Sequence, residues 1–435
     1  MKRLLKKWLL FAILLCYLGA GAQETSVLNL ETCYNLADRH YPMTRQYELL
    51  NQSEQFTVSN AGKAGLPQFS LSLRAGWQSE VTEIPPSLSA ILSQLSGKEV
   101  QFAALPQDQY QAVAEAGQLI WAGGSIQATR QASKAEAEVG KHKLDVELYV
   151  LRERISQLYF GILLLKEQQQ QTSLMMSELE VHLQRLQSLA TQGMAQAADL
   201  DVIRVEQLQL RQRQTTLQSN EEAYRLMLSA FIAQKVDAST ILEVPSPTLP
   251  PVDALSLKRP ELSLFESQSR LLDTRQSLLL SATRPRLSAF LQAGYGQPGL
   301  NMFKDGFSAF YLGGLRLNWN LSAFYTLQNN LGTLEVGRKE VQLHRETFLF
   351  QTNLGVIQQK SEIERLQSII NQDDEIIRLR VSLKEVAAAR VEYGTMTATD
   401  LVREINAVDQ ARMQRSLHGI QYLMAVYQLK TITNN

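Results

Sequence analysis

The stretch that decides the fold is residues 144–165, LDVELYVLRERISQLYFGILLL. Its apolar residues recur at alternating steps of four and three, at Leu144, Leu148, Leu151, Ile155, Leu158, Ile162 and Leu165. After two polar positions the same steps continue through Met176, Leu179, Leu183, Leu186 and Ala190. This heptad spacing predicts a coiled-coil helix. A continuous helix from Trp121 to Gly193 would be about 110 Å long, so we expect a rod or a tube instead of a compact domain.

Proline placement and recurring motifs divide the chain into two similar halves. Residues 107–244 and 299–435 contain no proline, as expected for two long helical blocks. Motifs recur at a constant offset of 218 residues, so that Pro42, Pro67 and Ala75-Gly76 match Pro260, Pro285 and Ala293-Gly294. We therefore predict a first structural repeat at 23–242, a proline-rich linker at 243–258 and a second repeat at 259–435. Each repeat is expected to run helix, strand, strand, very long helix and return helix.

The first 22 residues have the pattern of a secretory signal peptide. Four basic residues precede an apolar run that ends in Ala20-Gly21-Ala22, which predicts cleavage before Gln23. Lipidation of Cys16 stays open, although Leu15 stands where a lipid-attachment signal requires a small residue. Cys33 is then the only cysteine of the exported chain, which excludes an intramolecular disulfide and a cysteine metal cluster.

Composition and motifs argue against nucleic-acid binding and catalysis. The 43 basic and 43 acidic residues balance, and no basic patch suitable for phosphates is visible. The five histidines are scattered, without a second ligand three or four residues away, so we expect no metal site. The sequence has no glycine-rich phosphate loop, serine nucleophile elbow or Cys–His pair. We expect no cofactor and no enzymatic activity.

Four short segments alternate apolar and polar residues, as strands with one buried face do. The clearest is 68–77, QFSLSLRAGW; the segments at 287–295 and 315–321 repeat the pattern, and the alanine-rich segment before Trp121 is the weakest. A soluble sheet would explain this alternation. Aromatic residues at the strand ends favour a membrane barrel with interfacial girdles instead, namely Trp77, Trp121, Tyr295 and Trp319. Four strands cannot close a barrel, so two, three or four copies would have to supply 8, 12 or 16 strands.

Each long helix is followed by a glycine and then an Asp-Leu pair. Gly193 precedes Asp199-Leu200, and Gly394 precedes Asp400-Leu401. Helix capping explains both the glycines and the aspartates. In a symmetric assembly the same carboxylates would also form rings that attract cations and close a constriction through salt bridges. We expect the acidic cluster 373–375 to be a solvated helix face.

Several motifs, in this order, resemble those of the TolC-like outer-membrane efflux proteins. The stretch Leu28-Asn29-Leu30-Glu31-Thr32-Cys33-Tyr34 is similar to the N-terminal signature of that family, and Arg259-Pro260-Glu261-Leu262 resembles the start of its second half. Residues 118–124, QLIWAGG, resemble its strand-to-helix junction. The two glycine and Asp-Leu sites resemble its helical tips. The resemblance covers essentially the whole exported chain.

This resemblance implies an α+β membrane protein and a homotrimer, whose 12-stranded β-barrel in the bacterial outer membrane continues into a periplasmic α-helical coiled-coil tube. It implies a passive exit duct of a tripartite efflux pump or type I secretion system, in contact with outer-membrane lipid, a periplasmic adaptor (membrane fusion) protein and an inner-membrane pump of RND or ABC type. The adaptor-docking tips would be Gly193, Met194, Asp199, Leu200, Gly394, Thr395, Asp400 and Leu401.

The resemblance also suggests a periplasmic gate at Asp199, Asp400 and Arg403. Met396 stands where some members of the family carry arginine, and Arg403 where some carry a second acid. A periplasmic coiled-coil adaptor or structural spacer is the alternative function, since it would account for the export signal and the heptads. The exported substrate does not follow from the sequence.

Overall fold

The fold is taken from a computed structural model that describes residues 27–82, 85–99, 106–192, 196–248, 257–301, 304 and 306–434. The chain divides into two compact units. The unit that we call the strand unit comprises Gln46–Lys143 and Glu261–Glu346, and the helical unit comprises Met1–Arg45, Leu144–Pro260 and Thr347–Asn435. The predicted signal peptide, Gly193, Met194 and residues 249–256 of the predicted linker lie outside the described residues.

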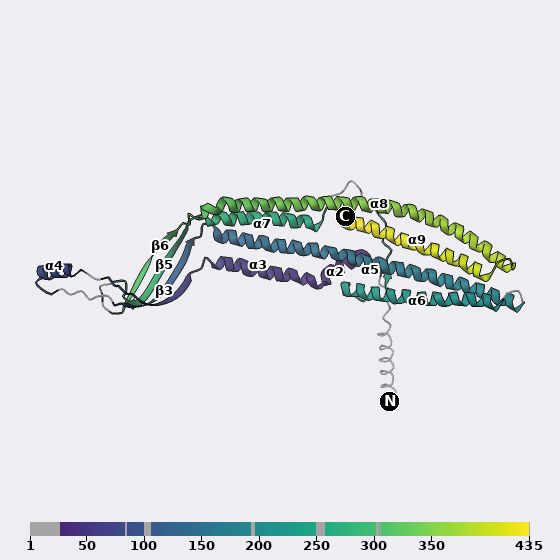
Figure 1. Cartoon of the computed structure of the whole chain (residues 1–435), viewed down its shortest axis with the longest axis horizontal. Helices are drawn as coiled ribbons and strands as arrows, with labels where there is room; N and C mark the ends of the chain where they lie inside the picture. The colour runs from purple at the N-terminus through teal and green to yellow at the C-terminus, as the bar shows by residue number, and fades with distance from the viewer. Residues whose placement is uncertain are drawn as a thin grey trace, which may run out of the picture. The chain divides into compact units, whose positions relative to one another are not determined.

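Along the chain, the order helix, strand, strand, long helix and return helix occurs twice (Figure 1). The first pass consists of β1 (Val27–Leu28), α2 (Leu30–His40), a 3₁₀ turn (Pro42–Arg45), α3 (Gln46–Lys63), β2 (Gln68–Trp77), α4 (Pro86–Ser96), β3 (Asp108–Trp121), α5 (Ser125–Thr191), α6 (Ala197–Ile232) and β4 (Ile241–Leu242). The second consists of α7 (Pro260–Ala282), β5 (Arg286–Gln297), β6 (Ser308–Asn318), α8 (Ala323–Glu392) and α9 (Ala398–Thr433). The two predicted long helices are confirmed, with 67 residues in α5 and 70 in α8.

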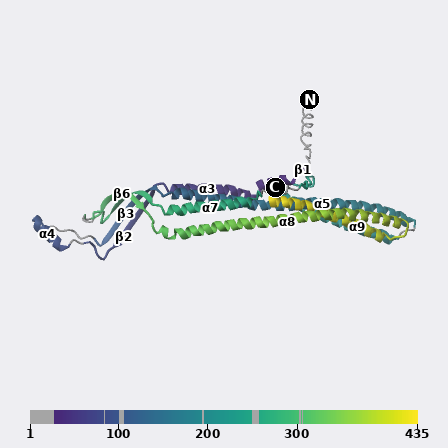
Figure 2. The same cartoon turned by 90° about the horizontal axis from the view of Figure 1, so that it is seen from above.

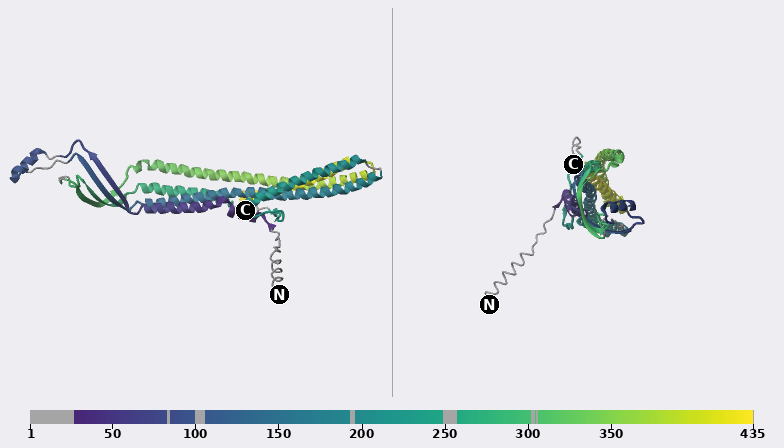
Figure 3. Two further views of the ribbon diagram at one scale, coloured as in Figure 1. Left: turned by 90° about the horizontal axis from the view of Figure 1, so that it is seen from below. Right: turned by 90° about the vertical axis from the view of Figure 1, so that its left-hand side faces the viewer.

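The strand unit contains an antiparallel sheet in the order β2-β3-β5-β6. The predicted strand at 68–77 is confirmed, and the alanine-rich segment before Trp121 forms β3, a strand of 14 residues. The strands are bent along their length (Figure 3). We call the end of the sheet with the connections 78–107 and 298–307 the loop end, and the end that leads into α5 and α8 the helix end.

Helices of the strand unit run beside one another in pairs. The Lys141 ammonium of α5 lies 2.9 Å from a Glu54 carboxylate oxygen of α3. Arg338 of α8 likewise donates to Asp273 of α7 at 2.8 Å, where α7 and α8 lie side by side (Figures 1 and 2). These helices bury few side chains, since α3 has no buried residue and α7 buries only Ser267 and Ser281.

The predicted junction between β3 and α5 is a tight glycine turn. Gly123 and Gly124 have φ angles of 64° and 88°, a left-handed conformation that favours glycine. A Cβ on Gly123 would lie 2.9 Å from the Arg284 Cβ and 3.1 Å from the Pro285 carbonyl oxygen. Both the conformation and the close approach of the 284–285 segment therefore require glycine at 123.

The heptad seam of α5 packs in the helical unit much as predicted. Its buried members are Leu144, Leu148, Leu151, Ile155, Ile162, Leu179, Leu183 and Leu186. The predicted polar interruption at Thr172 is also buried, because its hydroxyl donates to the Gln168 carbonyl oxygen at 2.8 Å. A threonine whose hydroxyl bonds the preceding turn presents an apolar methyl group to the seam.

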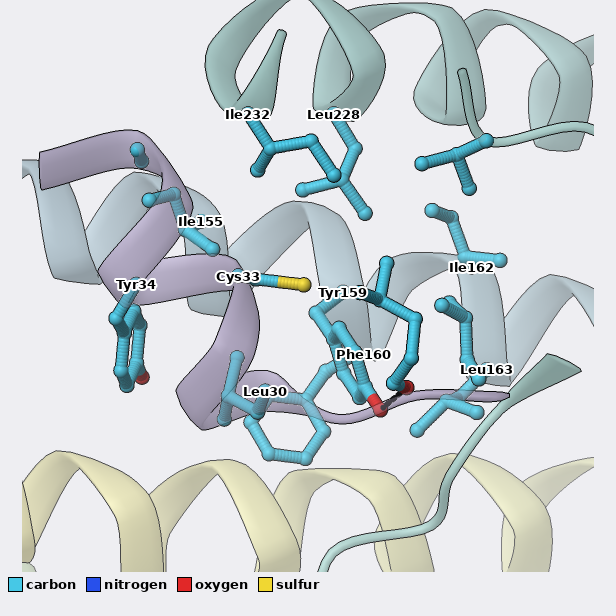
Figure 4. Close-up of a cluster of buried hydrophobic side chains, with 14 of the residues drawn as sticks. Leu30, Cys33, Tyr34, Ile155, Tyr159, Phe160, Ile162, Leu163, Leu228 and Ile232 are labelled. Atoms are coloured by element: carbon cyan, nitrogen blue, oxygen red, sulfur yellow. Dashed lines mark hydrogen bonds between the residues drawn. The ribbon is translucent and has the colours of Figure 1, made fainter. Parts of the chain in front are cut away.

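A core cluster gathers where α2 meets α5 and α6 (Figure 4). Cys33 of α2, Tyr159 and Phe160 of α5 and Leu228 and Ile232 of α6 are all fully buried in it. The Tyr159 hydroxyl lies within hydrogen-bond distance of the carbonyl oxygens of Leu28, at 2.8 Å, and Glu243, at 2.6 Å, which share its one proton. Tyr159 therefore holds the parallel β1–β4 pair against α5.

Among the described residues, no helix is long and apolar enough to cross a membrane.

Candidate functional site

The sheet has one apolar face and one polar face. The register places alternate residues of all four strands on the same side. We call this side the apolar face; its apolar members are Phe69, Leu71, Leu73, Ala75 and Trp77 on β2, Tyr110, Ala112, Ala114 and Ala116 on β3, Leu287, Ala289, Leu291, Ala293 and Tyr295 on β5, and Ala309, Tyr311, Gly313, Leu315 and Leu317 on β6. The polar residues Asp108, Gln118 and Gln297, near the strand ends, lie on the same side. Its large side chains are between 49% and 83% exposed, apart from Leu287, which is half-buried.

The exposed apolar side chains lie next to one another on all four strands, unlike the singly scattered apolar residues of an ordinary protein surface. Such a surface indicates contact with lipid or with another protein chain. The arrangement is therefore not that of a soluble sheet with its apolar side buried against helices of its own unit.

The opposite face, which we call the polar face, also carries the apolar side chains Val113, Phe290, Phe310 and Leu312, and it has an interacting polar cluster in the middle of the sheet. Glu115 accepts a hydrogen bond from Gln292 at 2.8 Å and lies 4.0 Å from an Arg316 nitrogen. The Arg316 guanidinium also lies over the ring of Phe290, 4.6 Å from its centroid. Phe290 interrupts the alternation of β5, and its cation–π contact explains how an aromatic ring fits the polar face.

The four predicted interface aromatics divide between the two ends of the sheet. Trp77 and Tyr295 lie at the loop end, where Trp77 pairs with Asp108 and Tyr295 with Ala112 and Ala309. At the helix end, a register shift brings Trp121 opposite Leu287, and Trp319 follows the last residue of β6. The Trp319 indole donates to the Thr283 carbonyl oxygen at 2.9 Å. Aromatic residues at both ends of an apolar face are typical of the two interfaces of a membrane-spanning sheet.

Both edge strands of this sheet have one neighbour only among the described residues. β2 and β6 are 10 and 11 residues long, so each leaves a row of backbone N–H and C=O groups at its free edge. Long unpaired edges are templates for pairing with a further strand. Among the described residues, no other strand pairs with the free edge of β2 or of β6.

The tip between α8 and α9 is built by local capping. Gly394 has a φ angle of 67°, and a Cβ there would meet no atom within 4 Å, so conformation and not space selects glycine. The Thr397 hydroxyl accepts from the Asp400 N–H at 3.2 Å and donates to the Asp400 carboxylate at 2.7 Å. Arg403 lies 3.1 Å from the same carboxylate. The Thr397 hydrogen bond and the Arg403 charge lower the pKa of Asp400.

At the tip between α5 and α6 the aspartate caps the helix directly, whereas Asp400 acts through the Thr397 hydroxyl. The Asp199 carboxylate accepts from the Gln196 N–H at 3.0 Å, just before α6 begins. Gly193 and Met194 of this tip lie outside the described residues. Both predicted tip aspartates are therefore helix-capping groups, whatever further role they have.

The regions next to the two tips pack together in the helical unit. Leu183 and Leu186 of α5, Ile203 of α6 and Leu401 of α9 belong to one buried cluster, and Leu200 packs against it. The structure thus brings Leu200 and Leu401 to one core, while Thr395 is exposed. Arg403 also approaches Glu404, at 3.8 Å, so its charge is shared between two acids.

One expectation about α8 is wrong. Asp373 is not on a solvated face; it is buried and lies 2.6 Å from the His418 Nδ1 of α9, while Asp374 accepts from Arg415 at 3.0 Å. Sequence reasoning missed these partners because they lie on another helix, more than 40 residues away. A short stretch of α8 also has heptad spacing, and we call it the α8 seam. It is exposed at all four positions, between 47% and 52%, at Ile376, Leu379, Leu383 and Val386.

Comparisons with solved structures give a consistent result. The outer membrane protein VceC of Vibrio cholerae is similar over 93% of this chain and 96% of its own, with 14% identity and a TM-score of 0.65. The Campylobacter jejuni CmeC outer membrane channel (93% and 85%, 13% identity, TM-score 0.63) and the open state of the Neisseria gonorrhoeae MtrE outer membrane channel (93% and 89%, 13% identity, TM-score 0.65) are similar in the same way. The chain has the fold of TolC-like outer-membrane channels.

No family model matches the sequence, and no curated protein is similar to it. The likeness therefore rests on the three-dimensional arrangement, and it confirms, for the fold, the resemblance inferred from short motifs.

Proposed function

We propose that this chain is the outer-membrane channel component of a tripartite efflux pump or a type I secretion system. It would act as a passive exit duct, docked to a periplasmic adaptor protein and an inner-membrane transporter of RND or ABC type. The observation that carries this proposal is the exposed apolar face of the sheet, opposite a polar face with Glu115 and Arg316. Strands with lipid on one side and water on the other have this alternation.

The proposal includes assembly into a homotrimer. Open strand edges are not tolerated in lipid, so β6 of one copy would pair with β2 of the next. Three copies would then close a 12-stranded barrel with the polar face inward. The exposed seam of α8 supports the same assembly, since a stripe at heptad spacing packs against another helix. Leader removal at 1–22 and duplication of one unit, at 23–242 and 259–435 around a linker at 243–258, complete the proposed organisation.

The proposed docking end comprises the two helical tips. An adaptor protein would contact Met194, Leu200, Thr395 and Leu401 beside the capping residues Gly193, Asp199, Gly394 and Asp400. The exposed position of Thr395 supports this role. The test is in-cell photo-crosslinking from a probe at Thr395, with a matched probe at the exposed Gln351 of α8, which lies about 65 Å along the helix. Capture of an adaptor from Thr395 alone supports docking, and equal capture from both positions or capture from neither contradicts it.

The channel itself is tested by conductance of the purified protein in planar lipid bilayers. Discrete single-channel steps are expected, together with retention in the outer membrane after carbonate extraction. The periplasmic adaptor or spacer function would instead give carbonate release and no conductance.

We also propose that Asp199, Asp400 and Arg403 form a periplasmic gate. Three copies of each carboxylate would form rings around the axis, which favour cations. Asp400 also caps α9, so two variants separate its roles. Asp400→Asn removes the charge and keeps an acceptor for the cap, whereas Asp400→Ala removes both. A loss of cation selectivity in both variants supports the gate; a change in the alanine variant alone shows capping only.

A further inference from the structure

The feature behind this inference is α4, a helix of 11 residues in the connection between β2 and β3. It was not anticipated from the sequence. Its apolar side chains, Leu88, Ile91, Leu92 and Leu95, have the i, i+3, i+4, i+7 spacing of a single helix face. All four are exposed, Leu95 at 79%, and no residue of α4 is buried.

An uncovered stripe of this kind does not suit a short helix in water. Helices below about 12 to 15 residues are marginal in isolation, and α4 has no charged residue with which to form stabilising ion pairs along its surface. Its ends are well defined, with Pro86 at the first turn and Gly97 in a left-handed conformation at φ 63°. A helix with specific ends and an apolar face therefore needs something apolar against that face.

We propose that α4 lies on the outer-membrane lipid surface with Leu88, Ile91, Leu92 and Leu95 facing the acyl chains. The inference rests on the proposed function, because it takes the apolar face of the sheet to be in lipid. The chain enters this connection directly from Trp77, the last residue of the apolar face on β2. Residues 78–85 span at most about 28 Å, which is enough for α4 to reach the interface that Trp77 marks.

Composition favours lipid over a second copy of the helix. The polar side of α4 consists of serine and glutamine, and the helix of about 16 Å is shorter than the three or four heptads on which helix–helix association normally depends. Aliphatic side chains on an uncharged helix enter the boundary between head groups and acyl chains without dehydrating a charge. A helix held there keeps the first outer connection beside the barrel and away from its exit.

The test uses single cysteines labelled with an environment-sensitive fluorophore. The full-length protein is reconstituted in vesicles of phosphatidylethanolamine and phosphatidylglycerol, with nitroxide quenchers on the acyl chains or in the water. Probes are placed at Leu95→Cys on the apolar stripe and at the exposed Ala90→Cys, about 140° away around the helix. The wild-type chain, labelled in the same way, gives the background from its own cysteines.

A third probe, Leu73→Cys on the apolar face of β2, reports on membrane insertion of the sheet. We expect lipid nitroxide to quench Leu73 and Leu95 strongly, and aqueous quencher to act on Ala90. Quenching of Leu73 from lipid and of Leu95 from water would overturn the placement of α4 alone. A disulfide between Leu95→Cys copies would also overturn it and assign the stripe to a second copy. Aqueous quenching of Leu73 would overturn the proposed function as well.

Discussion

The core around Cys33 and the apolar face of the sheet contain the same kinds of side chain in opposite settings. In the helical unit, Tyr159, Phe160 and Leu228 are fully buried within one chain. Among the described residues of the strand unit, Ala128 and Ala135 are the only buried apolar side chains, although Phe69, Leu71 and Leu73 are each more than 70% exposed. The hydrophobic effect stabilises the first region within the chain, and it can stabilise the second only through lipid or a further protein chain.

The largest predicted difference in stability is between the same truncation, phenylalanine to alanine, in the buried core and on the apolar face of the sheet. Phe160→Ala removes a fully buried ring that contacts Tyr159 and Tyr427, at centroid distances of 6.0 and 5.6 Å. We expect a loss of about 3–5 kcal/mol in the free energy of unfolding, as for other buried phenylalanines. Phe69→Ala, which is 80% exposed in the single chain, should cost far less in detergent. Denaturant unfolding of both variants measures the difference; equal losses would contradict it.

The next prediction compares an arginine substitution on each of the two faces of β2. Leu71→Arg places a charge on the apolar face, which costs about 2–4 kcal/mol near the middle of a bilayer. Ser70→Arg, the neighbouring residue, places the same side chain opposite Glu115 on the polar face, where it gains a partner. We expect the first variant to lose outer-membrane assembly and the second to keep it. Heat-resistant oligomers in membrane fractions provide the measurement, and equal assembly of both variants would favour a soluble sheet.

The buried and exposed regions also differed in how well sequence could predict them. Period and spacing predicted the α5 seam, the strand at 68–77 and the glycine turn at Gly394, because these depend on neighbours within one element. The identical spacing in α8 did not reveal that its seam lies exposed, since exposure depends on what other helices cover. Asp373 was assigned to a solvated face because its partner, His418, lies on α9.

Two elements of the strand unit show the same limit. β3 gave a weak pattern because alanine is apolar without being a strong strand former, and its identity depends on pairing with both β2 and β5. The polar cluster of Glu115, Gln292 and Arg316 comes from three strands, so only the register reveals it. The aromatic residues at strand ends were predictable, because a strand end can be recognised from the alternation alone.

A smaller effect is expected where polar groups complete the buried core. Tyr159→Phe removes the hydroxyl that lies within hydrogen-bond distance of the carbonyl oxygens of Leu28 and Glu243. The cost of leaving such buried acceptors unsatisfied is about 1–3 kcal/mol, although the Leu28 oxygen keeps a bond from the Glu243 N–H at 3.1 Å. Denaturant unfolding should show this loss, with faster amide exchange at β1 and β4. A loss of stability without faster amide exchange at β1 and β4 would contradict the assigned role of the Tyr159 hydroxyl.

The exposed α8 seam should respond through assembly and not through folding. Covering the exposed half of Leu383 contributes about 1 kcal/mol for each copy, and an aspartate there would oppose association. We expect Leu383→Asp to weaken the trimer on native mass measurement and leave the thermal unfolding of the single chain nearly unchanged. Ser382→Asp, on the adjacent exposed position, is the control. Trimers of equal stability in the two variants would remove the α8 seam from the interface.

The smallest effect concerns Cys33. Near neutral pH we expect its burial to change only the rate at which the thiol is alkylated. Burial raises the pKa of its thiol to about 12, against an ordinary value of 9.0. Only the thiolate reacts with alkylating agents, so at pH 8 the folded chain should react about a thousandfold more slowly at Cys33 than an ordinary thiol does. A cysteine at the exposed Thr395 provides that comparison.

The raised pKa of Cys33 also predicts that the free energy of unfolding falls at high pH. Above pH 9 the unfolded chain releases the Cys33 proton while the folded chain retains it, so the stabilisation is fully present below pH 9 and is lost as pH rises through 12. A Cys33→Ala variant should therefore lose less stability than the wild type over this range. Rapid alkylation of Cys33 in the folded protein at pH 8, at the rate of the Thr395→Cys thiol, would show that the core around Cys33 opens to water and would remove the contrast with the apolar face.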